Sequence, residues 1–225
     1  MISYWIQSDR IRHNVFIPKY YNPKIDARLN ALAQSHNCVA ISELVEEGVV
    51  SAATGHEIGK AAYGTGDIPF VRTSDIANWE IRSAPKQGVS EDIYAEYAAR
   101  QDVQEGDMLL VRDGTYLIGG NCFITKVDAR LLYQSHILKL RVNKKDVLDP
   151  TLLFLALNCD IVQQQLRAFQ FTADIIDTIG ERVYDVIVPL PKAADVRKSL
   201  TQRAAAALED RMRGKSVHQI CHSGY

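Results

Sequence analysis

The sequence predicts a mixed α/β or α+β fold, with a mixed, twisted β-sheet, long loops between the strands and an amphipathic helix near the C-terminal end. Short apolar runs bounded by Gly, Pro and Asp are typical of strands, whereas apolar residues that recur every three or four positions are typical of helices. Both patterns occur along the chain. Of its 225 residues, 47% are hydrophobic and 24% are charged, a composition that indicates a globular domain and excludes wholesale disorder.

The first predicted elements are helical. Asn22 is suited to cap a helix, and Pro23 to occupy its first position, where a missing N–H costs nothing, so we predict a helix over 24–36. A second, short helix is predicted over 39–45. Residues 51–67 are small, rich in glycine and without a period, which predicts a long loop.

The strands are predicted in the middle of the chain. Apolar runs place them at 68–72, 107–112, 116–125 and 136–142, with a helix over 91–99. Polar loops that contain glycine or serine adjoin the strand ends, at 51–67, 73–90 and 113–121. A rigid sheet that carries several such loops is suited to recognition.

The last part of the chain is predicted to be mainly helical. A helix begins at Pro150 and runs to 169, and a strand over 183–188 ends at the Pro189-Leu190-Pro191 segment. The final helix is predicted over 193–213. One stripe along it is apolar at every fourth residue: Val196, Leu200, Ala204, Leu208 and Met212.

The charge of the chain gives no sign of a nucleic-acid partner. There are 26 Lys and Arg residues against 27 Asp and Glu residues, a formal net charge of −1. A strongly basic face is the usual electrostatic footprint of a DNA-binding protein. A DNA-binding function must therefore come from the local arrangement of side chains.

The four cysteines and the N-terminal segment indicate the compartment. Cys38, Cys122, Cys159 and Cys221 have no paired spacing, so we predict free thiols rather than disulfides or a metal site. No apolar run approaches the roughly 20 residues of a membrane span, and the first residues lack the apolar region of a signal peptide. We expect a soluble, cytoplasmic protein without a membrane partner.

No catalytic motif stands out. Residues 55–60 have the glycines and lysine of a phosphate-binding loop, but the spacing is too short and no Ser or Thr follows. We therefore predict no catalytic residue, no metal and no enzymatic activity of this chain alone. His218, Cys221 and His222 could together hold a transition metal, but we interpret them as part of a frayed tail.

Three polar clusters lie at predicted strand ends, at 72–75, 112–116 and 134–136. Arginine can pair with guanine edges or phosphates, and hydroxyl groups can bind phosphate. Asp, Ser and Gly are also ordinary turn residues, and Arg72 and Arg112 could pair with their neighbouring aspartates. Each cluster alone favours a turn, and the three together favour a binding surface.

Four stretches, in this order and spacing, resemble a known family. They are Gly66 to Ile76, Gly106 to Gly114 with Ile118-Gly119, the helix from Pro150 followed by Thr178-Ile179-Gly180, and Val186 to Pro191. The chain resembles, over about 39–208, the target-recognition domain of type I restriction–modification specificity (S) subunits, and the related domain that ends many fused methylase–nucleases.

The resemblance implies a sequence-specific DNA-recognition subunit of a restriction–modification or related phage-defence system. Its partners would be double-stranded DNA, an adenine methyltransferase that binds S-adenosylmethionine, and a nuclease in some systems; this chain itself would need no cofactor. Loop positions beside the matching stretches are the candidate DNA contacts: Lys60, Tyr63, Arg72, Thr73, Ser74, Arg112, Thr115, Tyr116, Gln134, Ser135, Gln170 and Thr172.

The resemblance also suggests a division of the chain. We expect an N-terminal lead-in over 1–38, one recognition domain over 39–191, a docking helix over 192–213 and a flexible tail over 214–225. A whole S subunit has two recognition domains, so this chain looks like a half-sized version that pairs with a copy of itself or serves a methyltransferase. The apolar stripe of the last helix, or its basic face, would dock the partner; packing on the chain's own core is the alternative.

Two other interpretations stay open. The chain could be a protein-interaction or assembly factor of a defence complex that keeps the recognition fold without reading DNA, which the near-neutral charge favours. It could also be a C-terminal fragment of a fused methylase–nuclease.

Overall fold

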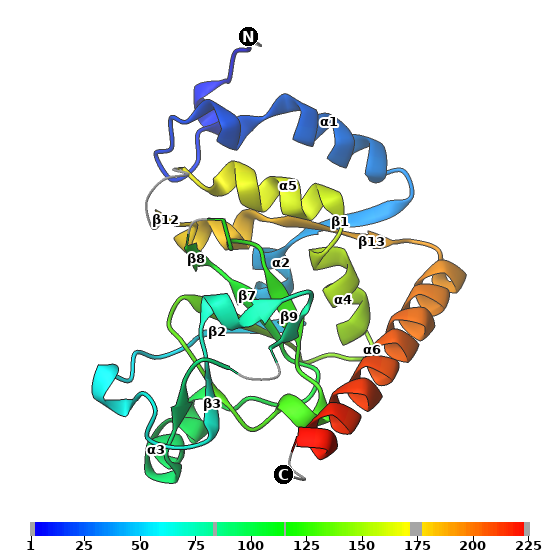
Figure 1. Ribbon diagram of the computed structural model, residues 1–225. Helices are drawn as coiled ribbons and strands as arrows, with labels where there is room; N and C mark the ends of the chain where they lie inside the picture. The colour runs from blue at the N-terminus through cyan, green and yellow to red at the C-terminus, as the bar shows by residue number, and fades with distance from the viewer. Residues whose placement is uncertain (1–2, 83–84, 115, 172–176, 223–225) are drawn as a thin grey trace.

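The computed structural model describes residues 3–82, 85–114, 116–171 and 177–222, and it has the predicted mixed α/β architecture (Figure 1). Its centre is a four-stranded antiparallel sheet in the order β2 (Val50–Thr54), β11 (Ile137–Val142), β7 (Met108–Val111) and β9 (Asn121–Phe123). The strands predicted at 107–112 and 136–142 are confirmed as the two inner strands.

Both faces of the central sheet are buried. Met108 and Leu110 of β7 point into the main core, whereas Leu109 and Val111 point into a second core on the opposite face. Alternate residues of a strand face opposite sides of a sheet, so β7 is apolar throughout. The main core is covered by α4 (Pro150–Leu157) and α5 (Asp160–Phe169).

A smaller sheet lies beside the first. Its central strand β3 (Ile68–Val71) runs parallel to β10 (Leu132–Tyr133) and antiparallel to β6 (Gly88–Val89). α3 (Glu91–Gln101) contacts β10, begins at the capping Ser90 and agrees with the predicted helix.

The N-terminal part of the chain pairs with a late strand. After the short 3-10 turns η1 (Ser8–Arg10) and η2 (Pro18–Tyr21) comes α1 (Pro23–Leu32), capped by Asn22 as predicted. β1 (His36–Ala40) then pairs antiparallel with β13 (Ile187–Pro191).

The helix predicted over 39–45 is shorter than expected, because its first residues belong to β1 and α2 spans Ile41–Glu46. The strand predicted over 183–188 is misplaced. Residues Gly180–Asp185 form the 3-10 helix η6, and β13 runs through both prolines. Proline is tolerated there because β13 has a neighbour on one side only.

Three other predictions were wrong in their extent. The loop predicted at 51–67 begins with β2, whose small residues do not show the alternation of apolar and polar residues that is typical of a strand. The loop predicted at 73–90 contains β6 and the hairpin of β4 (Ile76–Ala77) and β5 (Glu80–Ile81). The single helix predicted over 150–169 is two helices. The break occurs at Asn158, whose side chain bonds to Phe154 O and to Asn121, and Cys159 is extended.

The long final helix α6 (Ala194–His222) runs down one side of the molecule and extends nine residues past the predicted end at 213 (Figure 1). It contacts α4 and β13. Leu200 and Leu208 pack on the main core and Ala204 is buried, whereas Val196 is 42% exposed. The centre of the predicted apolar stripe therefore faces this chain's own core, as the packing alternative proposed.

The far end of α6 holds the β4–β5 hairpin. Arg211 Nη1 donates to Asn78 O at 2.6 Å, and Lys215 Nζ donates to Ile81 O at 3.0 Å. Lys215 also lies 3.2 Å from Asp128 Oδ1.

Within the described residues, no helix is both long and apolar enough to span a membrane.

Candidate nucleic-acid interface

One end of the sheets gathers several of the predicted loops. Because β11 runs antiparallel to β2 and β7, the last residues of β2 and β7 lie beside the first residue of β11. β3 and β10 end there too, since Gln134 N donates to Val71 O at 3.0 Å. We call this end the loop face; it comprises residues 54–57, 72–75, 112–114, 134–136 and 177–182.

Backbone hydrogen bonds tie the loop face together. β8 (Asp113–Gly114) pairs antiparallel with β12 (Asp177–Thr178). Arg112 N donates to His136 O at 3.0 Å, and Ile179 N donates to Arg112 O at 3.2 Å. β8 and β12 lie on the side of the molecule away from α6 (Figure 1). Three segments that are distant in sequence are thus held side by side.

A buried carboxylate occupies the centre of this face. Asp113 Oδ1 accepts the Thr178 hydroxyl, and Asp113 Oδ2 lies 3.1 Å from His136 Nδ1. Arg112 Nε lies 3.5 Å from Asp113 Oδ1 and is itself buried. The predicted pairing of Arg112 with its neighbouring aspartate is confirmed. His136 and Thr178 lie in stretches that the sequence singled out, but neither was among the candidate contacts.

The Arg112 guanidinium is held at two points. Besides its ion pair with Asp113, its Nη1 donates to Thr54 Oγ1 at 3.3 Å. The side chain is 16% exposed, and no hydrogen bond of Nη2 occurs within the described part of the chain. With Nε beside Asp113 and Nη1 bonded to Thr54, Nη2 is left to donate to an acceptor such as a phosphate or base-edge oxygen.

Arg72 follows the end of β3 in a turn that Asp75 closes. Arg72 N donates to the buried Asp75 Oδ2 at 3.0 Å, and the Arg72 side chain lies 3.9 Å from the same oxygen. Thr73 and Ser74 form the 3-10 turn η4 (Thr73–Asp75) and are partly exposed. The turn interpretation therefore holds for Asp75, while the preceding side chains reach the surface.

Gln134 and Ser135 form the turn between β10 and β11. The Ser135 hydroxyl donates to Glu57, which holds the 55–60 loop against this turn. Both residues are partly exposed. The structure thus brings Arg72, Arg112, Gln134 and Ser135 to one face, as predicted.

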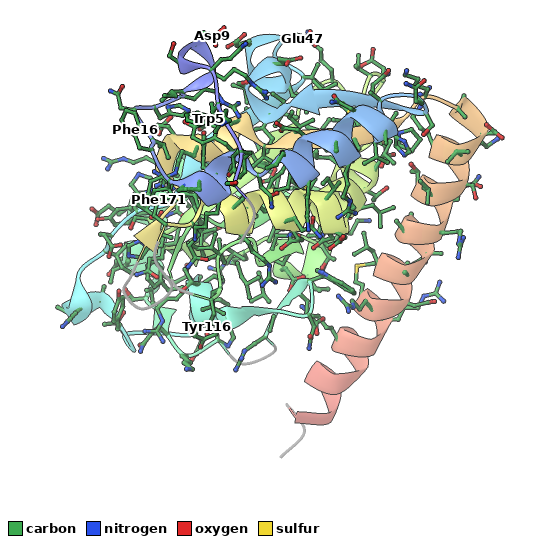
Figure 2. The ribbon with its side chains drawn as sticks, turned by 90° about the horizontal axis from the view of Figure 1, so that it is seen from above. Trp5, Asp9, Phe16, Glu47, Tyr116 and Phe171 are labelled. Carbon is green, nitrogen blue, oxygen red and sulfur yellow. The ribbon has the colours of Figure 1, made fainter. Side chains whose placement is uncertain are left out.

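The other candidates lie elsewhere. Lys60 is exposed in η3 (Lys60–Ala62), on the turn that projects beside α3 (Figure 1). The Tyr63 ring stacks on the Phe70 ring, with 5.5 Å between the two centroids. Tyr116 is 86% exposed and, like Phe171, lies on the side away from α6 (Figure 2). Gln170 is partly buried after α5. Thr115, Thr172 and the side chains of His218, Cys221 and His222 lie outside the described residues.

Replacing Gly55 with alanine is expected to lower the free energy of unfolding by about 1–3 kcal/mol. A Cβ at this position would lie 2.3 Å from Tyr133 O and 2.4 Å from Gln134 O, both backbone atoms. Thermal unfolding of the variant measures this loss. Gly214→Ala is the control, since open space surrounds that helical position and alanine favours helix. Equal melting temperatures for Gly55→Ala and the unchanged protein would contradict the close approach.

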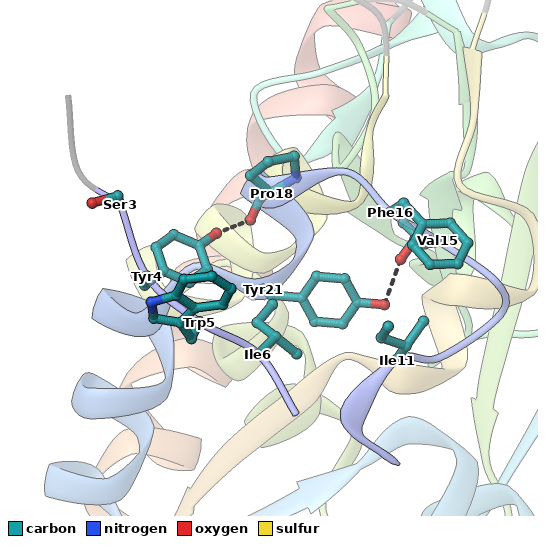
Figure 3. A pocket seen from close by; sticks show the side chains of 9 residues that line it. All are labelled: Ser3, Tyr4, Trp5, Ile6, Ile11, Val15, Phe16, Pro18 and Tyr21. Carbon is teal, nitrogen blue, oxygen red and sulfur yellow. Dashed lines mark hydrogen bonds between the residues drawn. The ribbon is translucent and has the colours of Figure 1, made fainter. Parts of the chain in front are cut away.

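The N-terminal segment carries a second surface feature. Tyr4, Trp5, Ile11, Phe16 and Tyr21 are among the residues that line a hollow of about 310 Å³ (Figure 3). The Tyr21 hydroxyl donates to Val15 O at 2.8 Å at one side of it. Trp5 and Phe16 are mostly exposed. This hollow is apolar and shares none of the loop-face residues.

The loop face offers hydrogen-bond donors of several kinds and no metal site. Among the described residues, no three His, Cys, Asp or Glu side chains lie close enough together to hold a metal ion. Arginine, hydroxyl, amide and imidazole groups are instead the side chains that contact phosphates and base edges. The arrangement is suited to binding a polar, anionic ligand.

Comparison with known proteins identifies the fold. No protein-family model matches the sequence, and no curated protein does either. The structure resembles that of the type I restriction–modification S subunit from M. genitalium, with a TM-score of 0.54 and 12% identity over 80% of this chain. This chain covers 40% of that protein, so it spans less than half of its length.

Two further solved structures match more loosely. The HsdS subunit from Thermoanaerobacter tengcongensis has a TM-score of 0.48 and 16% identity, over 88% of this chain and 46% of that one. A chain from a structure on the assembly and conformational transition of the type I R-M system has a TM-score of 0.48 and 14% identity, over 95% of this chain and 53% of that one. At the level of the fold, the resemblance predicted from the sequence motifs is confirmed: this chain shares its fold with part of a type I restriction–modification S subunit.

Proposed function

We propose that this chain is the sequence-specific DNA-recognition subunit of a restriction–modification or related phage-defence system. The observation that carries the proposal is the loop face, where a fold shared with an S subunit brings Arg72, Arg112, Gln134 and Ser135 together. Hydrogen bonds from such side chains to base edges in a groove discriminate among sequences.

In this function the covalent chemistry belongs to another polypeptide. A partner adenine methyltransferase would bind S-adenosylmethionine and flip the target base, and a nuclease would join it in some systems. This chain would be non-catalytic and would act with its partners in the cytoplasm. It would determine the DNA sequence at which its partners act.

The proposed target is built from half-sites. We propose that one recognition domain over 39–191 reads one half-site. Two copies related by a two-fold axis would read a symmetric, bipartite sequence. The exposed basic residues of α6, among them Lys198 and Arg203, would dock the second copy or the methyltransferase.

The proposal is tested by expressing the chain with an adenine methyltransferase from its own genome, purifying them together and mapping methylated adenines by sequencing. We expect methylation at one short sequence, and only when both proteins are present. DNA affinity should fall with salt, by roughly 0.9 log units per neutralised phosphate for each tenfold rise. Absence of DNA binding, with and without the methyltransferase, would contradict the proposal.

A second function is favoured by different observations. The net charge of −1 and the exposed Trp5 and Phe16 beside the apolar hollow suit an assembly factor that binds a protein. Association with a protein partner that does not depend on salt, together with no affinity for DNA, would select this alternative.

A further inference from the structure

The candidate contacts on the loop face come from segments that do not adjoin in sequence, and one side chain joins three of them. Asp113 in β8 accepts the hydroxyl of Thr178 in β12 and lies 3.1 Å from the ring of His136 before β11. The Arg112 guanidinium lies 3.5 Å from the same carboxylate. The carboxylate is buried, which strengthens its interactions with charged and polar groups.

The two basic partners of Asp113 keep donor atoms that this network does not use. The His136 side chain is 41% exposed, and within the described residues only its Nδ1 has a hydrogen-bond partner. A carboxylate on Nδ1 fixes the orientation of an imidazole ring and leaves Nε2 available. Arg112 Nε lies 3.5 Å from Asp113 Oδ1 without a hydrogen bond between them, Nη1 donates to Thr54 Oγ1, and no hydrogen bond of Nη2 occurs within the described residues.

We propose that Asp113 is a positioning residue for DNA recognition: its buried carboxylate orients the Arg112 guanidinium and the His136 ring for contact with the duplex. This inference rests on the proposed function and names residues within the same face. A side chain that is held in its binding conformation before association loses less conformational freedom when it binds. His136 is thereby added to the candidate contacts.

The chain supplies a matched control for a merely structural role. Asp107 is also buried and also paired with an arginine, with its Oδ1 2.7 Å from Arg141 Nε. It precedes β7, whereas Asp113 follows it. Six residues of extended chain at about 3.3 Å each place the two carboxylates about 20 Å apart. Loss of either charge disturbs a buried ion pair, but only Asp113 lies on the loop face.

The experiment uses the full chain and DNA duplexes. A preferred duplex is first selected from a random-sequence pool with the unchanged protein. Its affinity and those of all single-base-pair substitutions of it are then measured for the unchanged protein, Asp113→Asn, Asp107→Asn and Thr178→Val. The last variant removes one hydroxyl, which donates to Asp113 and accepts from Gly180 N at 2.9 Å, and leaves the carboxylate in place. It decides the question if Asp113→Asn does not fold.

We expect Asp113→Asn to reduce discrimination by about tenfold at one or two adjacent base pairs, with the salt slope of non-specific binding unchanged. Thr178→Val should lose less, at the same base pairs, and Asp107→Asn should be less stable with unchanged discrimination. Full discrimination by a folded Asp113→Asn would overturn the inference and leave the proposed function standing. If Asp113→Asn does not fold, full discrimination by Thr178→Val would have the same consequence. Equal losses in Asp113→Asn and Asp107→Asn would do the same. If the unchanged protein selects no sequence, either alone or together with the methyltransferase, the proposed function fails and the inference fails with it.

Discussion

Replacing Asp107 with alanine is expected to lower the free energy of unfolding by about 3–5 kcal/mol, because it removes the buried carboxylate that faces the buried Lys139 and leaves Arg141 with one of its two carboxylate partners. Asp107 Oδ1 and Oδ2 lie 2.7 and 2.8 Å from Arg141 Nε and Nη2, and Lys139 Nζ lies 3.9 Å away. Lys139 is itself buried, and desolvation lowers its pKa while Asp107 opposes that shift. Urea denaturation of the variant measures the loss.

Asp102→Asn is the control for this prediction. Asp102 pairs with the same arginine, with its Oδ2 2.6 Å from Arg141 Nη1, but its side chain is 52% exposed. An exposed pair contributes about 0–1 kcal/mol, and asparagine tolerates the left-handed conformation at this position, where φ is +41°. Equal losses for the two variants would show that burial of Asp107 does not govern its contribution.

The same pair has a pH dependence of known sign. The hydrogen bond from Arg141 holds the pKa of Asp102 below its ordinary value of 3.8. A carboxyl group with a lowered pKa in the folded state stabilises the fold at neutral pH, and this contribution is lost as the pH falls through the lowered pKa. In Asp102→Asn this acid-dependent part is absent.

Replacing Arg112 with alanine is expected to weaken binding of the target duplex by about tenfold to a hundredfold and to relax the sequence preference at one base pair. The guanidinium is held between Asp113 and Thr54 on the loop face, and alanine removes its donors altogether. Titration of the target and of single-base-pair substitutions measures both effects.

Arg130→Ala is the matched control. This arginine precedes β10, whereas the loop face follows that strand, and it pairs with Glu91 on the surface. The affinity and sequence preference of Arg130→Ala should be close to those of the unchanged protein. An Arg112→Ala variant that binds every duplex more weakly by the same factor would indicate a phosphate contact instead of a base contact.

Local sequence signals predicted much of the fold. The capped helix α1, the apolar strands β7 and β11, and most of α6 follow from caps and periodicity that act within a few residues. β2 was missed because Ser51, Ala52 and Ala53 have no strong strand preference, and its pairing with β11 decides its conformation.

The candidate site was predictable only in part. Arg72, Arg112 and Gln134 stand at strand ends, and the sequence pattern shows this. The network around Asp113 was not predictable, because its members lie in segments separated by 23 residues in one case and 65 in the other. The antiparallel pairing of β8 with β12 brings them together, and two-residue strands leave no pattern in a sequence.

The central sheet, covered on both faces, separates two tasks within the molecule. The apolar residues of β7 and β11 make the scaffold rigid, while the polar side chains that meet the solvent sit on short segments beyond the strand ends. Substitutions of the exposed side chains in those segments cost little stability, whereas substitutions of the buried side chains in the strands cost much. Under the proposed function, a lineage that carries this protein could therefore acquire a new DNA target by a few substitutions without having to evolve a new scaffold.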